Sequence, residues 1–273
     1  MEKIALPQKI KFEKGELPHQ EIVTIEPCYP GYGITLGNSL RRVLISSLPG
    51  AAVIGVKIKG ADHEFMTMPH IKEDVLEIIM NLKKLRLKVF SAEVVKLELD
   101  VHGEKNVTAE DIEKNSEVEV VNPELSLANI TDMAGNLKME IFVARGRGYE
   151  TVEGREKIKH EIGYIEIDSA YSPIMAVGVH VENARVGKMT NWDKLILDIT
   201  TDGTIKVEDA FNDSVKILIE QFSSLTGEKP VVAAEVKAEE PEVKSVINDM
   251  IGGEEEVEAE DDSKKRRGRP KKS

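Results

Sequence analysis

The chain has 273 residues, of which 41% are hydrophobic and 32% charged, and its formal net charge is −12. This composition is typical of a soluble globular protein with one or two sizeable cores. Its apolar runs are far shorter than the roughly 18 residues that a membrane-spanning helix requires, and the N-terminus lacks the apolar stretch of a signal peptide. The single cysteine, Cys28, excludes an internal disulfide and cysteine-based metal sites, so we expect a cytoplasmic protein.

The charge is unevenly distributed near the C-terminus. Residues 254–262 contain seven acidic side chains, and residues 263–273 contain seven basic ones. Because these two runs cancel, residues 1–253 keep the whole net charge of −12, which argues against a body that binds polyanions in general. Any direct contact with DNA is therefore expected from the C-terminal tail.

Two strands and a helix are predicted at the start of the chain. β-branched residues in rough alternation indicate strands over 4–13 and 22–26. A helix is predicted over 35–50, with Asn38 or Ser39 as its N-cap.

This first helix has two different faces and is expected to stop at Pro49-Gly50. The aliphatic face carries Leu36, Leu40, Val43, Leu44 and Leu48. The opposite face carries Arg41, Arg42 and Ile45. An apolar side chain beside two guanidinium groups suggests a contact surface, although a single exposed isoleucine is also common on any protein.

The middle of the chain is expected to be rich in strands. A strand over 51–59 precedes an amphipathic helix at about 70–86. Short strand-like segments separated by turn residues then fill 87–181, which predicts a small antiparallel sheet. Alternation is cleanest over 94–100, where Val95, Leu97 and Leu99 are expected on one face. A further strand is predicted over 194–201.

The last predicted helix, about 207–225, has a long one-sided apolar stripe. Its members are Phe211, Val215, Leu218, Phe222 and Leu225, with Val207 at the start. The nearest comparably wide stripe belongs to the first helix, so the two are expected to share a core. The sequence therefore predicts an α+β protein in which a domain formed by 1–50 plus 174–227 is interrupted by an inserted, mostly antiparallel β domain at 51–173. Residues 228–273 are too polar to fold alone and are predicted to be a disordered linker and tail.

Five blocks of this sequence resemble, in order, the bacterial DNA-directed RNA polymerase alpha subunit family. They are TLGNSLRRVLISSLPG at 35–50, EDVLEIIMNLKKL at 73–85, RGRGY at 145–149, DSAYSP at 168–173 and NWDKLILDITTDGTI at 191–205. The resemblance covers roughly residues 4–227. It implies a non-catalytic homodimer that scaffolds assembly of the two large catalytic subunits, within a complex that is a nucleotidyltransferase, located at the nucleoid.

The same resemblance implies roles for individual residues. In the expected dimer interface the two one-sided helices of each copy meet those of the other, through Leu36, Leu40, Val43, Leu44, Leu48, Phe211, Val215, Leu218, Phe222 and Leu225. The residues expected to contact the large subunits are Arg41, Arg42, Ile45, Lys83, Arg145 and Arg147. For Lys83, a solvated lysine on a polar helix face is the alternative that the sequence alone leaves open.

Candidate catalytic and metal-binding groups are scattered. The six histidines show no metal-ligand spacing, no serine lies in a nucleophile elbow, and neither a cofactor nor a metal is predicted. The glycines of 145–149 allow either a phosphate cradle or a flexible basic turn between strands. The spacing lacks the lysine and hydroxyl of a P-loop, which favours the turn.

The C-terminus departs from the family, whose members ordinarily end in a second compact domain that binds promoter DNA. Here the residues after Gly227 do not resemble that domain. The tail contains Arg267, Gly268, Arg269 and Pro270, which are similar to an AT-hook that places arginines in a narrow A·T minor groove. A basic solubilising tail is the open alternative. Our second hypothesis is that the chain acts through this basic tail alone, as a free-standing DNA-architectural protein.

Overall fold

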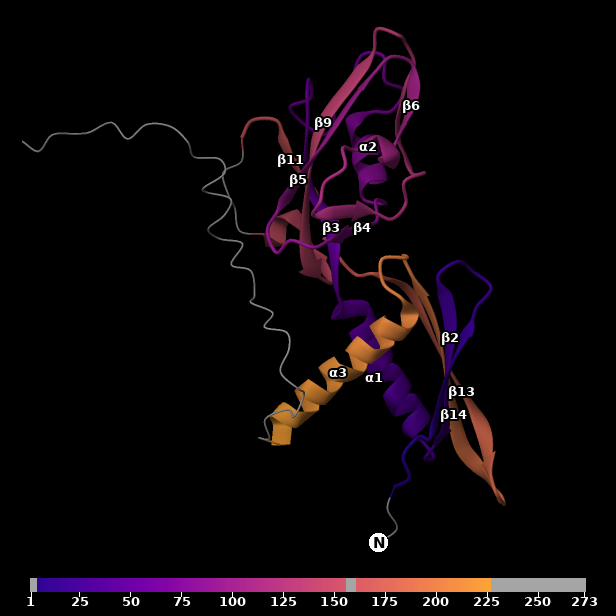
Figure 1. Ribbon diagram of the computed structural model, residues 1–273. Coiled ribbons are helices and arrows are strands. Elements are labelled where there is room, and N and C mark those ends of the chain that lie inside the picture. Colours follow the sequence, from indigo (N-terminus) through magenta and orange to yellow (C-terminus); the bar gives the residue numbers. More distant parts are fainter. Residues whose placement is uncertain (1–3, 156–160, 227–273) are drawn as a thin grey trace, which may run out of the picture. The chain divides into compact units, whose positions relative to one another are not determined.

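The computed structural model describes residues 4–155 and 161–226, and the predictions for 228–273 lie outside these ranges. Within them, three α-helices accompany strands whose pairings are all antiparallel (Figure 1). The predicted α+β class with mostly antiparallel sheets is confirmed. The apolar residues form two separate clusters, each built on its own four-stranded sheet.

The first sheet joins segments from both ends of the described chain. Its strands, in spatial order, are β1 (Lys9–Lys14), β2 (Gln20–Cys28), β14 (Met189–Thr201) and β13 (Ile174–Val186). Helix α1 (Tyr32–Ser46) packs against β13 and β14, and α3 (Val207–Thr226) lies across α1 (Figure 1). We call this cluster the α1–α3 core. It places Leu40, Leu44 and Leu48 beside Val207 and Phe211, so the two apolar stripes share a core as predicted.

The predicted N-cap of the first helix is wrong. Helix α1 begins at Tyr32, after Gly31, whose left-handed φ of 85° suits glycine. The free N–H groups of Gly31 and Gly33 donate to Asp193 Oδ2 at 2.9 and 3.0 Å. The carboxylate that caps the helix therefore comes from β14, distant in sequence, and no local pattern could reveal it. Ser39 lies inside the helix.

The end of the first helix also differs from the prediction. Helix α1 ends at Ser46, and Pro49 and Gly50 already belong to the next strand, β3 (Pro49–Ile58). The predicted strand over 51–59 is therefore confirmed but begins two residues earlier. The Pro-Gly pair connects the helix directly to this strand.

The second sheet holds the other cluster, which we call the β3–β9 core. Its strands, in spatial order, are β11 (Tyr164–Glu166), β3, β9 (Asn136–Arg147) and β5 (Val95–His102). Three ribbons flank it: β4 (Leu87–Val89) with β7 (Val118–Val120), β6 (Lys105–Thr108) with β8 (Ser126–Ile130), and β10 (Tyr149–Glu150) with β12 (Ser169–Ala170). Short 3-10 turns span Ala109–Asp111 and Val152–Gly154. The alternation predicted for β5 is confirmed, since Val95, Leu97 and Leu99 are buried.

The second helix is shorter than predicted. Helix α2 spans Val75–Leu82, and the carboxylate of Asp74 caps it by accepting from the N–H of Glu77 at 2.7 Å. Upstream, the N–H of Lys72 donates to the carbonyl of Asn129 at 3.0 Å, and Glu73 accepts from the N–H of Asn129 at 2.7 Å. Pairing with β8 therefore replaces the first predicted turn of the helix.

The β13–β14 hairpin extends further than its apolar pattern predicts. The prediction covered the parts near the core, whereas both strands have 13 residues and turn at Gly187, which has a φ of 61°. The outer part, 182–191, is polar and almost entirely exposed, so it carries no alternation. Backbone pairing forms this extension, together with an ion pair between Lys194 and Glu182 at 3.1 Å and a hydrogen bond from Arg185 Nε to the carbonyl of Gly187 at 3.0 Å.

Candidate functional site

The exposed face of α1 carries the three residues predicted there. Arg41, Arg42 and Ile45 are exposed, and 43% of the Ile45 surface is accessible. Within the described ranges neither arginine forms an ion pair or a side-chain hydrogen bond. Two unpaired cations beside an apolar side chain can bind an acidic, partly apolar protein surface.

The block RGRGY is mostly strand: its first three residues end β9, and only Gly148, with a φ of 66°, forms the predicted bend between β9 and β10. Arg145 and Arg147 are exposed there and pair through the backbone with Ala51 and Pro49 of β3. Sterics explain the glycine between them. A Cβ at Gly146 would lie 2.7 Å from the ring of Tyr171, so glycine lets that ring cover the strand.

The end of β9 meets the end of α1. Gly148 has a φ of 66°, and a Cβ on it would lie 3.2 Å from the carbonyl oxygen of Ser46, in the last turn of α1. The carbonyl of Gly148 accepts from the N–H of Tyr171 at 2.8 Å. The end of β9, which carries Arg145 and Arg147, therefore lies beside the last turn of α1, and the segment that contains DSAYSP is hydrogen-bonded to it.

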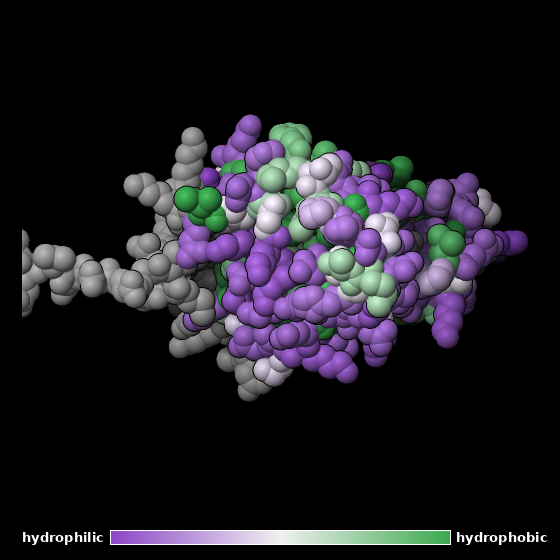
Figure 2. All heavy atoms as spheres, turned by 90° about the horizontal axis from the view of Figure 1, so that it is seen from above, coloured by the Kyte–Doolittle hydropathy of each residue, from purple (hydrophilic) through white to green (hydrophobic). Residues whose placement is uncertain are grey.

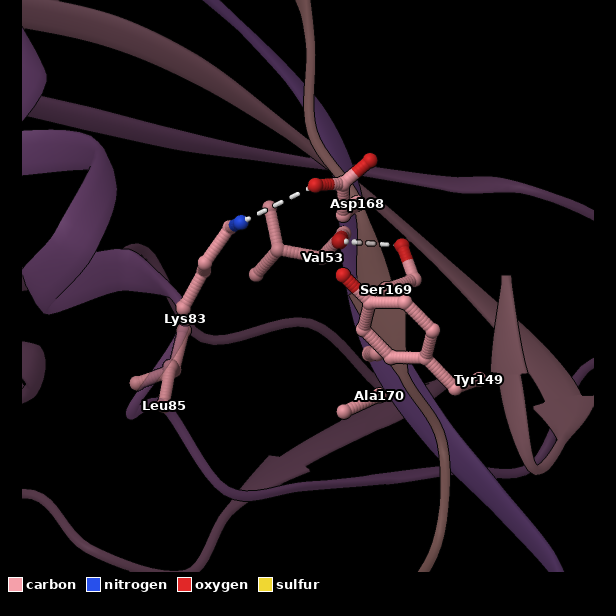
Figure 3. A pocket seen from close by; sticks show the side chains of 8 residues that line it. Val53, Lys83, Leu85, Tyr149, Asp168, Ser169 and Ala170 are labelled. Atoms are coloured by element: carbon pink, nitrogen blue, oxygen red, sulfur yellow. Dashed lines mark hydrogen bonds and ion pairs between the residues drawn. The ribbon is translucent and has the colours of Figure 1, made fainter. Parts of the chain in front are cut away.

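Lys83 lies beside the same segment. It follows α2 as its C-cap residue, and its Nζ is 3.6 Å from Asp168 Oδ2. A small pocket between them is also lined by Tyr149 and Ser169 (Figure 3). The N–H of Val152 donates to Asp168 at 2.9 Å, and this bond, with Lys83 nearby, lowers the pKa of Asp168. Lys83 is thus an exposed lysine, with 42% of its side chain accessible, whose ion-pair partner is Asp168.

The structure therefore brings the predicted contact residues to connected elements. We call the set Arg41, Arg42, Ile45, Lys83, Arg145 and Arg147 the docking surface. Sequence reasoning missed Asp168 and Tyr149, although both lie in the quoted blocks. Tyr149 directly follows Gly148, and Asp168 is the first residue of DSAYSP, but these positions indicate a contact only once the strands are paired.

Comparison with known proteins explains why these elements occur together. Residues 56–172 match the RNA polymerase Rpb3/RpoA insert domain. A DNA-directed RNA polymerase subunit alpha from Oceanobacillus iheyensis is 48% identical over 253 residues, which cover 89% of this chain and 80% of the relative. The subunit alpha from Carboxydothermus hydrogenoformans is 44% identical over 254 residues, covering 88% and 81%. That from Desulforamulus reducens is 51% identical over 203 residues, covering 74% and 64%.

The chain belongs to the DNA-directed RNA polymerase alpha subunit family. As an alpha subunit it is part of the polymerase complex. The α-helices of the described ranges include none that is both long and apolar enough to cross a membrane. Residues 4–155 and 161–226 contain no group of three or more His, Cys, Asp or Glu side chains that could hold a metal ion.

The alpha-subunit residues predicted for the dimer interface differ in how much surface they expose. Four are buried in the α1–α3 core of the single chain, namely Leu40, Leu44, Leu48 and Phe211. Four are partly buried, namely Leu36, Val43, Val215 and Leu218. Phe222 and Leu225, at the end of α3, are 59% and 81% exposed. The buried group leaves almost no surface for a second copy.

The predicted DNA-binding residues of the tail, Arg267, Gly268, Arg269 and Pro270, lie outside the described residues. Their role is a matter for experiment. Figure 2 shows one face of the molecule, on which hydrophilic residues dominate and hydrophobic ones form small, separated groups.

Proposed function

We propose that this alpha subunit is a non-catalytic homodimer in the cytoplasm that joins the two large catalytic subunits of the polymerase through its docking surface. The observation that carries the proposal is the meeting of α1, β9 and the 168–171 segment. This junction holds exposed arginines that have no ion-pair partner among residues 4–155 and 161–226, the exposed Ile45, and Lys83 beside Asp168, on connected elements.

The charge of the docking surface supports an acidic partner. The chain carries a net charge of −12, yet the five charged residues of this surface are all cations. Arginine suits protein interfaces because its guanidinium binds carboxylates in a bidentate manner and loses little hydration. Ile45 would supply the apolar centre that excludes water around these ion pairs.

The exposed apolar residues of the two helices support dimerisation. On α3, Ile219, Phe222 and Leu225 are 49%, 59% and 81% exposed. On α1, Tyr32 and Ile34 are 41% and 58% exposed. Exposed apolar side chains of this kind are covered at lowest cost by an identical surface in a two-fold dimer. We therefore propose that these residues, with the partly buried Leu36 and Leu218, form the interface.

The proposal includes the domain organisation. The α1–α3 core draws on residues between 23 and 48 and between 174 and 211, while the β3–β9 core lies between 53 and 167. This division supports a dimerisation domain at 1–50 plus 174–227 and an inserted domain at 51–173. The insert would bring Lys83, Arg145 and Arg147 to the docking surface.

Co-purification with the large subunits tests the docking surface. We expect the double variant Arg42→Ala with Ile45→Ala to remain a soluble dimer and to lose co-purification with a large catalytic subunit, because both the charge and the apolar anchor are removed. Arg185→Ala is the matched control, since Arg185 is exposed on the β13–β14 hairpin, far along the chain from the docking surface. Co-purification of the double variant at the level of the control would refute this role.

The C-terminal tail is the second part of the proposal. Two arginines around Gly268 can enter a narrow A·T minor groove, and the flanking basic residues can contact phosphates. We expect the whole chain to bind A·T-rich duplex more tightly than G·C-rich duplex, with an affinity that falls steeply as salt rises. Equal binding to both duplexes, or no loss after deletion of 263–273, would leave a solubilising tail.

A free-standing DNA-architectural protein remains the alternative function. Membership of the alpha subunit family favours the polymerase role. Purification from native cells separates the two: the polymerase role predicts migration with the large subunits, and the alternative predicts migration with bulk chromosomal DNA.

A further inference from the structure

A mostly buried arginine connects three strands beside the docking surface. Arg155 follows the Val152–Gly154 turn, and only 16% of its side chain is exposed. Its Nε donates to Glu150 Oε2 at 3.1 Å, its Nη1 to the carbonyl of Ile54 at 2.9 Å and its Nη2 to Ser169 Oγ at 2.6 Å. These acceptors belong to β10, β3 and β12, so one side chain bridges all three strands.

Each acceptor of Arg155 also binds a second group. The hydroxyl of Tyr171 donates to Glu150 Oε2 at 3.1 Å, and Ser169 Oγ donates to the carbonyl of Val53 at 2.8 Å, a bond drawn in Figure 3. The carbonyl of Ile54 accepts from the N–H of Ile167 at 2.9 Å. Arg155 therefore lies at the centre of a network that attaches 167–171 to β3.

The attached segment holds parts of the docking surface. Asp168, next to Ser169, lies 3.6 Å from the ammonium of Lys83. Tyr171 donates its N–H to Gly148 and packs its ring against Gly146, between Arg145 and Arg147. Displacement of 168–171 would thus release both Lys83 and the end of β9.

We propose that Arg155 is a positioning residue for the docking surface: it fixes the 168–171 segment so that Lys83, Arg145 and Arg147 keep one arrangement. This inference rests on the proposed function. Burying a charge costs free energy, and a core that needed only volume would be served by an apolar side chain. A guanidinium in this place reaches three acceptors in fixed directions, which a lysine ammonium cannot do.

Hydrogen exchange on the full chain tests the attachment. We compare wild type with Arg155→Met and Arg155→Lys, and use Arg185→Met as the matched control. In Arg155→Met we expect amide protection over 148–152 and 167–171 to fall about tenfold, because the network opens locally. Arg155→Lys should give an intermediate loss. The β14 amides over 195–199 in the α1–α3 core should stay protected in all variants.

Binding to the purified large subunits tests the positioning role. With the dimer intact, we expect the affinity of Arg155→Met to fall about tenfold and that of Arg155→Lys to fall less, as expected for a less ordered surface. Unchanged protection, or an equal loss of protection in both cores, would overturn the inference. So would lost local protection with unchanged affinity. Hydrogen exchange is measured on the free chain, so it tests whether Arg155 attaches 167–171 to β3 independently of binding. If wild type itself fails to bind the large subunits, that result refutes the proposed function and not the attachment.

Discussion

The two cores of the chain differ in how fully one copy covers them. In the β3–β9 core, the inward-facing residues of β5 and β9 are closed off, with Leu97, Leu99 and Ile141 no more than 2% exposed. In the α1–α3 core, the first half of α3 is buried, whereas Phe222 and Leu225 in its second half are mostly exposed. The β3–β9 core is closed within a single chain, although Phe65 and Phe90, outside its sheet, are 75% and 65% exposed. On α3, by contrast, the apolar stripe itself runs on from the buried core to exposed residues, which offers apolar surface to a second copy.

The largest expected effect comes from charging the uncovered half of α3. We expect Phe222→Glu with Leu225→Glu to weaken dimerisation by at least 100-fold, because large apolar anchors dominate interface free energies. Analytical ultracentrifugation measures the mass of each variant in solution.

The matched control for this variant lies beside the other core. Phe90 follows β4 and is 65% exposed, so Phe90→Glu adds the same charge at an equally exposed phenylalanine. It should leave the dimer unchanged. If Phe90→Glu weakened dimerisation as much as the α3 variant does, the exposed end of α3 would not be the specific dimer surface.

The next effect comes from opening the complete core. Leu99 is fully buried in β5, so Leu99→Ala should lower the free energy of unfolding of the β3–β9 core by about 2–5 kcal/mol. Hydrogen exchange over 95–101 reports this core, and fluorescence of Trp192, on β14, reports the α1–α3 side. We expect the exchange to change and the dimer to persist. Loss of the dimer in this variant would show that the cores are not independent.

A smaller effect is expected at the cap of α1. Asp193→Ala removes the acceptor of the Gly31 and Gly33 N–H groups and should lower the free energy of unfolding by about 1 kcal/mol. Asp193→Asn keeps an acceptor oxygen and should lower it less. Urea denaturation followed by Trp192 fluorescence measures both variants, and equal stability of Asp193→Ala and wild type would contradict the cap.

The smallest expected effect is a pH dependence of the free energy of unfolding, which comes from Tyr164 on the β3–β9 side. Burial raises the pKa of Tyr164 to about 12, above its usual value of about 10. The folded state therefore keeps this proton longer than the unfolded state does, and the stabilisation is full below pH 10 and lost as pH rises toward 12. Tyr164→Phe should reduce the alkaline loss of stability in urea titrations, whereas Tyr149→Phe, at an exposed tyrosine, should not.

Strong periodicity made most of the fold predictable. The stripe of α3 and the alternation of β5 are set by local burial, and both elements appear where their patterns begin and end. Elements held by distant partners were predicted poorly. The start of α1 depends on Asp193, and the first residues of the predicted 70–86 helix pair with β8 instead. In both cases the deciding hydrogen bond joins residues far apart in sequence.

The site was predictable only in part. The exposed positions of Arg42 and Ile45 follow from helix geometry, and the family resemblance pointed to Lys83 and the 145–147 arginines. The link between them required strand pairing, because Asp168 and Tyr171 contact Lys83 and Gly146 only after β10 and β12 are aligned. No sequence pattern indicated Arg155, because its role depends on hydrogen bonds to acceptors on three different strands, which are brought together only by the fold.

We propose that two copies complete the α1–α3 core and that this dimer joins the large subunits. Native mass spectrometry of the assembly, reconstituted from the full chain and the purified large subunits, tests it most directly. We expect two copies of the chain with one of each large subunit for wild type, and no such assembly for Phe222→Glu with Leu225→Glu. A single copy of the chain in the wild-type assembly, or full assembly by the charged variant, would contradict the account.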